Sequence, residues 1–208
     1  MKTLILILDN LRSTYNVGAI LRSAEAFAVS EIIFVGVTPF LDKGLPYERE
    51  KLRRAIHKTA LGAEARLAFR RFSDLQEAIS ALKKEGFTCF ALEQSPTSLN
   101  LTDFSLQTLS RASKIALALG EETQGFIATK LSLFDAVFEI PMLGKKESFN
   151  VSVAAGIALW ECRRQDLIDA SLHDKRKYLR KQNTLLPPVE SPLSPLDNLQ
   201  SDKPKDQS

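Results

Sequence analysis

The sequence predicts an α/β fold in which helices cover both faces of a mostly parallel sheet. Short apolar runs alternate with stretches of helical periodicity along most of the chain, and several runs, such as LILIL and IALAL, are apolar at every position. A strand that is apolar throughout is typical of a sheet buried on both faces. The 208 residues, 44% of them hydrophobic, are enough for one domain with a short appendage.

Strands and helices are expected to alternate up to about residue 140. The expected strands are Leu4–Leu8, Ile32–Val35, Leu67–Phe72, Thr88–Leu92, Ile115–Leu119 and Ala136–Ile140. The expected helices between them are Gly18–Ala28, Glu48–Ala60, Leu75–Lys84 and Ala128–Leu133. A polar loop follows the last strand, and apolar residues then return at helical spacing near residues 149–168, which predicts a further helix.

Composition divides the chain into three segments. Residues 1–165 carry the alternating pattern and are expected to form the main domain. Residues 166–186 contain a basic stretch and are expected to form a helical extension. In residues 187–208 Pro, Ser, Asp and Lys dominate and periodicity disappears, which predicts a disordered tail.

Cysteine usage and hydropathy indicate the compartment. Cys89 and Cys162 are far apart and have no Cys-x-x-Cys partner, so we expect neither a disulfide nor a metal site. The first apolar run is too short for a signal peptide, and no stretch approaches the length of a membrane span. A cytoplasmic protein is therefore expected. Its net charge of +3 permits nucleic-acid binding without requiring it.

Three loops place glycines and polar residues just after a predicted strand, at the sheet edge where ligands usually bind. In the first, Asn16 and Gly18 precede or begin a helix, and Arg22 lies about one turn into it. The free N–H groups of such a helix start can hold an anion, to which Arg22 can add a phosphate or hydroxyl contact. A capped helix whose arginine makes a surface ion pair is the alternative, and spacing alone does not decide.

The second loop follows the strand Ile115–Leu119 and contains Gly120, Glu121 and Glu122. A glycine directly after the strand permits close approach by a ligand. Two adjacent carboxylates can serve as an acid and base pair, but a charged helix start is the commoner reason for them.

The third loop gathers Ser148, Asn150 and Ser152 where the last helix should begin, which suits both helix caps and hydrogen bonds to a ligand. Lys145 and Lys146 can contact phosphate there, although solvated loop charges are the commoner case.

In order and separation, the three loops resemble the motifs of the SpoU (TrmH-like) family of RNA methyltransferases. The family's Asn-x-Gly turn with a helical arginine is similar to NVGAILR at residues 16–22. Its Gly-x-Glu-x-x-Gly is similar to GEETQG at residues 120–125, which singles out Glu122 of the two glutamates. Its Ile-Pro-Met and Ser-Leu-Asn-Val-Ser are similar to IPMLGKKESFNVS at residues 140–152, where Phe149 replaces the usual leucine.

The resemblance implies a SPOUT-type fold with a carboxyl-terminal trefoil knot, and a homodimer with the substrate site at the subunit interface. It implies methyl transfer from S-adenosyl-L-methionine to a ribose 2'-hydroxyl of tRNA or rRNA, and it implies no metal. The catalytic residues that it implies are Arg22, Asn16, Glu122, Ser148 and Asn150. The cofactor-binding residues that it implies are Leu92, Leu119, Gly120, Ile140, Met142, Ser148 and Phe149.

An arginine stays charged at ordinary pH, so we expect Arg22 to orient the hydroxyl and a nearby phosphate rather than to act alone as a base. The expected RNA-binding residues are Arg12, Lys145, Lys146, Lys175, Arg176 and Lys177. His57 lies in the Arg- and Lys-rich segment 49–58, for which contact with RNA is one interpretation and a solvated helix face the commoner one. Among RNAs, tRNA is favoured because the basic extension resembles that of tRNA-acting relatives.

Two other functions stay open on sequence alone. A non-catalytic RNA-binding protein with the same fold would need a damaged cofactor loop or no motif arginine, whereas this chain keeps both features. A doubly wound nucleotide-binding protein would carry Gly-x-Gly-x-x-Gly after its first strand, which this chain does not.

Overall fold

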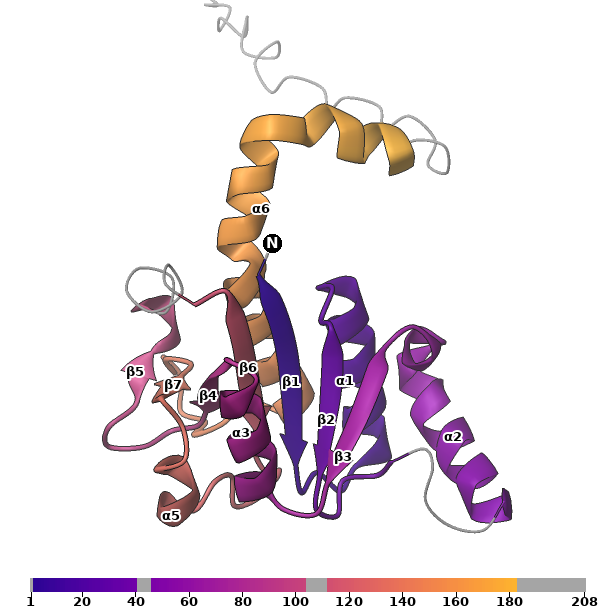
Figure 1. Cartoon of the computed structure of the whole chain (residues 1–208), viewed down its shortest axis with the longest axis vertical. Helices are drawn as coiled ribbons and strands as arrows, with labels where there is room; N and C mark the ends of the chain where they lie inside the picture. Colours follow the sequence, from indigo (N-terminus) through magenta and orange to yellow (C-terminus); the bar gives the residue numbers. More distant parts are fainter. Residues whose placement is uncertain (1, 41–45, 104–111, 183–208) are drawn as a thin grey trace, which may run out of the picture. The chain divides into compact units, whose positions relative to one another are not determined.

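The computed structural model describes residues 2–40, 46–103 and 112–182, and its core is a parallel sheet (Figure 1). Seven strands of the described chain lie in the order β3-β2-β1-β6-β4-β7-β5, and every neighbouring pair is parallel. The strands are β1 (Thr3–Asp9), β2 (Glu31–Val35), β3 (Ala68–Phe72), β4 (Thr88–Leu92), β5 (Leu99–Asn100), β6 (Lys114–Leu119) and β7 (Ala136–Glu139). The parallel α/β class is therefore confirmed.

Helices connect the strands. They are α1 (Thr14–Ala26), α2 (Pro46–Ala60), α3 (Leu75–Lys84), α5 (Ala128–Leu131) and α6 (Val151–Gln182), with the 3-10 turns η1 (Ala63–Ala65) and η2 (Leu101–Asp103). Residues up to Asp169 form one compact unit, and α6 continues past that residue. The predicted tail, residues 187–208, lies outside the described residues.

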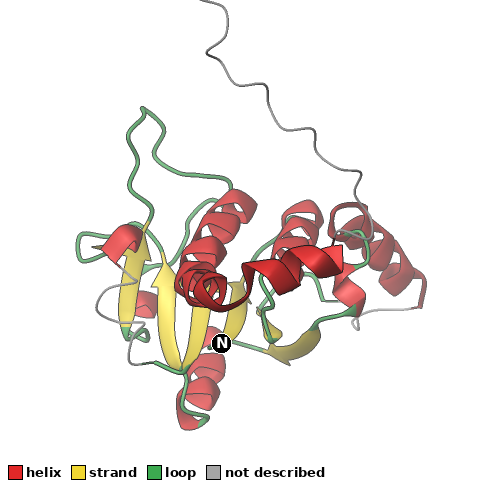
Figure 2. Ribbon diagram, turned by 90° about the horizontal axis from the view of Figure 1, so that it is seen from above, coloured by secondary structure: helices red, strands yellow, loops and turns green. Residues whose placement is uncertain are grey.

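The two faces of the sheet have separate cores because successive side chains of a strand point to opposite sides. In β1, Leu4, Leu6 and Leu8 pack with α1, α2 and α6 on one face, and Ile5 and Ile7 pack with α3 on the other. Figure 2 shows helices on either side of the strands. Both cores are apolar, which explains why these strands read as continuous hydrophobic runs.

The first helix begins earlier than predicted, at Thr14 instead of Gly18. Its start is capped by Ser13, whose hydroxyl oxygen accepts a hydrogen bond of 3.2 Å from the backbone N–H of Asn16. Arg22 therefore lies about two turns into α1 and not one. The strand β5 was not predicted, because it has only two residues and both are exposed.

A buried arginine ties α6 to the end of α1. Arg163 is 3% exposed, and its guanidinium donates to the backbone oxygens of Phe27, Ala28 and Lys2 and to the carboxylate of Asp166. Five donors in a rigid fork suit this set of acceptors. The part of α6 around Arg163 is thereby held against the sheet face that α1 covers.

Among the described residues, no helix has the combination of length and apolar character that a membrane span needs. Within the same residues, no cluster of three or more His, Cys, Asp and Glu side chains is arranged to hold a metal ion.

Candidate active site

The three predicted loops meet at one edge of the sheet. Strand β6 lies between β1 and β4, and all three run in the same direction, so their carboxyl ends are neighbours. In Figure 1 the strand arrows end at the same edge, from which the loops after β1, β4, β6 and β7 emerge. Ligands of open α/β sheets usually bind at such an edge.

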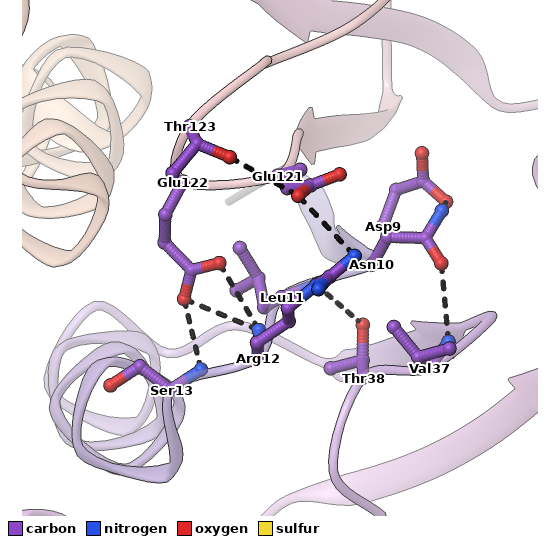
Figure 3. A network of polar contacts seen from close by, with 10 residues as sticks. All are labelled: Asp9, Asn10, Leu11, Arg12, Ser13, Val37, Thr38, Glu121, Glu122 and Thr123. Atoms are coloured by element: carbon purple, nitrogen blue, oxygen red, sulfur yellow. Dashed lines mark hydrogen bonds and ion pairs between the residues drawn. The ribbon is translucent and has the colours of Figure 1, made fainter.

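The carboxylate of Glu122 binds the start of α1 (Figure 3). It accepts hydrogen bonds from the backbone N–H of Ser13 at 3.0 Å, from that of Arg12 at 3.1 Å and from the side-chain amide of Asn16 at 3.3 Å. Free N–H groups at a helix start favour a negative partner. The anion expected at this helix start is thus the protein's own carboxylate, and an external anion is not needed to satisfy these groups.

These contacts keep Glu122 ionised. Partial burial disfavours the charged carboxylate, but the hydrogen bonds from Ser13, Arg12 and Asn16 outweigh it, and the pKa of Glu122 is lowered below its ordinary value. At neutral pH the residue is therefore a fixed negative charge and a hydrogen-bond acceptor, which does not suit a general acid. The neighbouring Glu121 instead lies 3.6 Å from the guanidinium of Arg12 and accepts from the hydroxyl of Thr123.

The first and third motifs touch through two asparagines. Asn150 donates from its side-chain amide to the side-chain oxygen of Asn16, at 3.2 Å. Its own side-chain oxygen accepts from the backbone N–H of Ser152 at 2.9 Å and from the Ser152 hydroxyl at 2.6 Å, which caps α6. Asn16 therefore contacts both Glu122 and Asn150, and its side chain joins all three motifs.

A residue that sequence reasoning missed, Glu93, holds the other end of the second loop. Its carboxylate accepts from the backbone N–H of Phe126 at 2.8 Å and from that of Gln94 at 3.0 Å. Gly125 has a positive φ of 59°, and a Cβ there would lie 2.0 Å from Glu93 Oε2. The signal available in the sequence was a carboxylate directly after the fourth strand, at the same sheet edge as the motifs.

Gly120 leaves room for the loop that follows it. A Cβ on this residue would lie 2.9 Å from the carbonyl carbon of Gly125 and 3.1 Å from the backbone nitrogen of Phe126. The missing side chain therefore makes room for the protein's own loop, which folds back onto the end of β6. Gly120 also lines the pocket described below, so the expectation that a glycine here permits close approach of a ligand stays a prediction.

A buried ion pair supports the first loop from below. Asp9, at the end of β1, is 2% exposed, and its carboxylate lies 2.6 Å from the ammonium group of Lys130. It also accepts from the side chain of Asn10, which has a φ of 57° and accepts from the backbone N–H of Val37 (Figure 3). Both asparagines and aspartates tolerate such turns well. The pair was not predicted, because Asp9 and Lys130 are 121 residues apart.

A pocket of about 230 Å³ opens between the loops after β4, β6 and β7. Every residue predicted to bind the cofactor lines it, namely Leu92, Leu119, Gly120, Ile140, Met142, Ser148 and Phe149. Four glutamates also line it, Glu93, Glu121, Glu122 and Glu139, whereas no lysine or arginine appears among its described lining residues. The pocket is therefore acidic and apolar, which favours a ligand with positive charge and an apolar ring over a phosphate.

The remaining predicted residues lie outside this pocket. Arg22 is exposed on α1, and neither it nor Asn16 lines the pocket. Lys145 and Lys146 are exposed in the loop before α6, and the Arg12 side chain is 73% exposed. The last predicted residues, Lys175, Arg176 and Lys177, belong to the distal part of α6, of which the structure describes the backbone and not the side chains.

Comparison with known proteins gives a consistent picture. The model of the SpoU rRNA Methylase family matches residues 3–160. The 23S rRNA (guanosine-2'-O-)-methyltransferase RlmB of Coxiella burnetii is 35% identical over 167 residues, which are 78% of this chain and 58% of that protein. The tRNA (guanosine(18)-2'-O)-methyltransferase of Thermus thermophilus is 33% identical over 174 residues, 83% of this chain and 79% of that one.

A solved structure shares the fold. The AdoMet-bound rRNA methyltransferase of Sinorhizobium meliloti superposes with a TM-score of 0.63 and 24% identity, over 79% of this chain and 57% of that one. The chain thus spans somewhat more than half the length of its RlmB-type relatives.

Proposed function

This chain belongs to the SpoU rRNA Methylase family, and we propose that it transfers a methyl group from S-adenosylmethionine to a ribose 2'-hydroxyl of RNA. The observation that carries the proposal is the position of an acidic, apolar pocket next to the Glu122–Asn16–Asn150 contacts. Both relatives described above are named as guanosine 2'-O-methyltransferases.

The pocket fits this cofactor better than it fits NAD or ATP. S-adenosylmethionine carries a net positive charge and an adenine ring, whereas NAD and ATP carry phosphates that four glutamates would repel. Leu92, Ile140 and Phe149 can hold the ring. The glutamates are held mainly by backbone N–H groups and hydroxyls, which do not neutralise them, so their negative charge favours the positively charged cofactor. When bound, S-adenosylmethionine would supply an electrophilic methyl group: the ribose oxygen would bond to the methyl carbon while the carbon–sulfur bond breaks, the sulfur leaving as a neutral thioether and the hydroxyl proton passing to solvent.

The protein's own contribution is mainly positioning. Glu122 holds the first turn of α1 through two backbone N–H groups, and Asn16 and Asn150 connect that turn to α6. Arg22 follows two turns later as an exposed cation, suited to a phosphate and to the reacting hydroxyl. Ser148, which lines the pocket, is the remaining polar group proposed to contact substrate or cofactor.

A homodimer is part of the proposal. On α6, Val153, Trp160 and Leu167 recur every seven residues and are 49%, 51% and 46% exposed, so they form an uncovered apolar stripe. Because Arg22 lies outside its own protomer's pocket, a second copy covering this stripe is proposed to bring Arg22 to the partner's pocket.

Subunit complementation tests this arrangement. Neither Arg22→Ala nor Met142→Arg, which places a cation in the pocket, should be active alone, but a mixture of the two should regain about a quarter of wild-type activity if the site is shared between subunits. A mixture as inactive as its components, or a wild-type monomer at working concentration, would show that each protomer acts alone.

We propose tRNA as the substrate class, because the tRNA-acting relative is matched over 79% of its length, against 58% for the rRNA-acting one. The proposed RNA contacts are Arg12, Lys145 and Lys146 in the domain 1–165, and Lys175, Arg176 and Lys177 in the extension 166–186. Methylation of unmodified tRNA and rRNA transcripts in parallel, with the modified nucleotide mapped, distinguishes the two substrates.

Two further proposals concern topology and location. The carboxyl-terminal trefoil knot of the SPOUT type is supported by the meeting of residues 92–94, 119–125 and 139–154 around one pocket. Experimental tracing of the backbone over residues 88–160 tests the knot.

A cytoplasmic location is supported by two buried cysteines without a disulfide, and cell fractionation tests this location.

The activity is tested by titration and by transfer. S-adenosylmethionine should bind with a higher affinity than NAD or ATP, and labelled methyl groups should appear on ribose 2'-oxygens. Arg22→Ala should abolish transfer and leave cofactor binding intact. Failure to bind S-adenosylmethionine would refute the proposal, and RNA binding without transfer would favour the non-catalytic alternative.

A further inference from the structure

The helix α2 is rich in positive charge. It contains five Lys and Arg residues against two Glu, and its sequence PYEREKLRRAIHKTA has little apolar content outside a narrow stripe. The sequence favoured a solvated face for this segment over contact with RNA, which it left open. Its position in the fold points to a more specific role.

The carboxyl-terminal end of α2 rests on α1, close to the first motif. The Thr59 hydroxyl donates to the backbone oxygen of Tyr15 at 2.9 Å, and Gly18 is so close to α2 that a Cβ would lie 2.3 Å from the Ile56 carbonyl oxygen. Asn16 lies between the two α1 residues that make these contacts. The helix is thus anchored beside the residue that joins the three motifs.

Arg22 lies on the flank of α1 that adjoins α2 and the following turn. It follows Gly18, which contacts α2, by one helical turn, and it precedes Glu25 by three residues. The carboxylate of Glu25 is bound by Arg66, just after η1, at 3.1 Å. Residues one turn apart share a helix face, so a substrate that reaches Arg22 also comes next to the α2–η1 segment.

The first half of α2 extends away from this anchor. All residues from Pro46 to Lys51 are exposed, and only Ile56 and Ala60 are buried. In Figure 1, α2 begins at the end of the molecule to which the strand arrows point, the edge that carries the candidate active site. The stretch from Arg49 to Lys58 is about 14 Å long, at about 1.5 Å per residue, which is enough to follow several backbone phosphates.

Most of these cations have no acidic partner within the described part of the chain. Arg54 pairs with Glu50 at 2.9 Å, and His57 contacts Glu64. Arg49, Lys51, Arg53 and Lys58 are exposed and make no described ion pair. Arg49 and Arg53 are four residues apart, a spacing at which like charges repel. A negatively charged partner would remove this repulsion.

We propose that α2, through Arg49, Lys51, Arg53 and Lys58, binds the sugar–phosphate backbone of the RNA whose ribose is presented to Arg22. The proposal rests on the proposed function. The chemistry fits a polyanion better than a membrane, because the apolar side chains of α2 are packed against α1, and Tyr47 is the large hydrophobic exposed on α2. Contacts of this kind position RNA without reading its sequence.

A charge-matched pair of variants tests the proposal. Arg49→Gln/Lys51→Gln/Arg53→Gln removes three cations from α2. The control Lys83→Gln/Lys84→Gln/Lys114→Gln removes three cations from the end of α3 and the amino end of β6. These residues lie away from the edge of the sheet where the three motif loops meet. Glutamine retains a high helix propensity, and circular dichroism of both variants checks that they are folded.

Binding of unmodified tRNA is measured by fluorescence anisotropy at several KCl concentrations between about 50 and 300 mM, because contacts to phosphate weaken as the salt concentration rises. The α2 variant should bind tRNA at least about tenfold more weakly at low salt. The slope of log K plotted against log[salt] should become shallower by about 2, because each lost phosphate contact removes roughly 0.7–0.9 from it. The control should change less than about twofold. In transfer assays the α2 variant should raise KM for RNA and leave kcat at saturating RNA unchanged.

Equal losses in both variants would indicate a general effect of net charge and overturn the proposal, as would unchanged binding in both. A change in oligomeric mass of the α2 variant would identify this face as a subunit contact instead and would also overturn it. S-adenosylmethionine binding is titrated in the wild type and in both variants. A wild type that does not bind S-adenosylmethionine would refute the proposed function, while the RNA measurements would still decide the role of α2.

Discussion

The side-chain amide of Asn150 donates a hydrogen bond to the side-chain oxygen of Asn16, 3.2 Å away and 134 residues earlier in the chain. Asn16 donates in turn to Glu122. One amide side chain therefore connects the helix that carries Arg22, the loop after β6 and the start of α6. A network whose members are each held by another is sensitive to small changes in any one of them.

Replacing Asn150 with Asp tests this connection with little structural change. The carboxylate can still cap α6 by accepting from Ser152, but it cannot donate to Asn16. We expect methyl transfer to fall by about tenfold or more, equivalent to about 1.4 kcal/mol in activation free energy, with thermal stability near that of the wild type. Asn16→Ala should add little to the effect of Asn150→Asp. Fully additive losses in the double-mutant cycle would show that the two residues act independently.

Replacing Glu122 with Gln should make the free energy of unfolding vary less with pH in the acid range. The folded-state pKa of Glu122 is lowered, so its ionised form stabilises the protein fully above its unfolded pKa of about 4.3, and this contribution is lost as the pH falls through the lowered value. Because Glu122 is exposed, we expect a difference of only about 1 kcal/mol between wild type and variant at pH 7. Urea unfolding should show this difference narrowing below about pH 4. A difference that is constant from pH 7 to pH 3 would contradict the assignment.

Replacing Gly18 with Ala should destabilise the protein although alanine is the better helix former. The added methyl group would lie 2.1 Å from the Thr59 hydroxyl and 2.3 Å from the Ile56 carbonyl oxygen, which forces α2 away from α1. We expect a loss of about 1–3 kcal/mol in the free energy of unfolding, measured in urea. Adding Thr59→Ala should restore only part of it, since the Ile56 carbonyl remains. Full recovery would mean that the helix backbones are not in close contact.

Removing Lys130 should be more harmful than removing the whole ion pair. Lys130→Met leaves the buried carboxylate of Asp9 without its cation. A broken buried pair costs about 3–5 kcal/mol, and we expect about 2 because the lysine side chain is partly exposed. The double variant Asp9→Asn/Lys130→Met should be more stable than Lys130→Met alone in chemical unfolding. If the double variant is less stable than Lys130→Met, the hydrogen bond from Asn10 and not the ion pair with Lys130 is the main partner of the Asp9 carboxylate.

Parts of the site followed from the resemblance of three short motifs to the SpoU family. That resemblance singled out Glu122 over Glu121, and the residues that it implies around the cofactor all line the same pocket. Other parts did not follow. Gly120 also makes room for Gly125, and Glu93 was passed over although it holds the same loop. The contact between Glu93 and Phe126 joins residues 33 positions apart, whose proximity no local pattern reveals.

The amino-acid sequence by itself determined the class of the fold, since apolar periodicity depends on near neighbours and sets which residues of β1 or α3 are buried. Only the tertiary structure decided what the polar residues do. It inserts β6 beside β1, and this strand order brings Glu122 onto the N–H groups of Arg12 and Ser13, about 110 residues away. Contacts across such separations depend on the order of strands in the sheet, which the local preferences of residues do not specify.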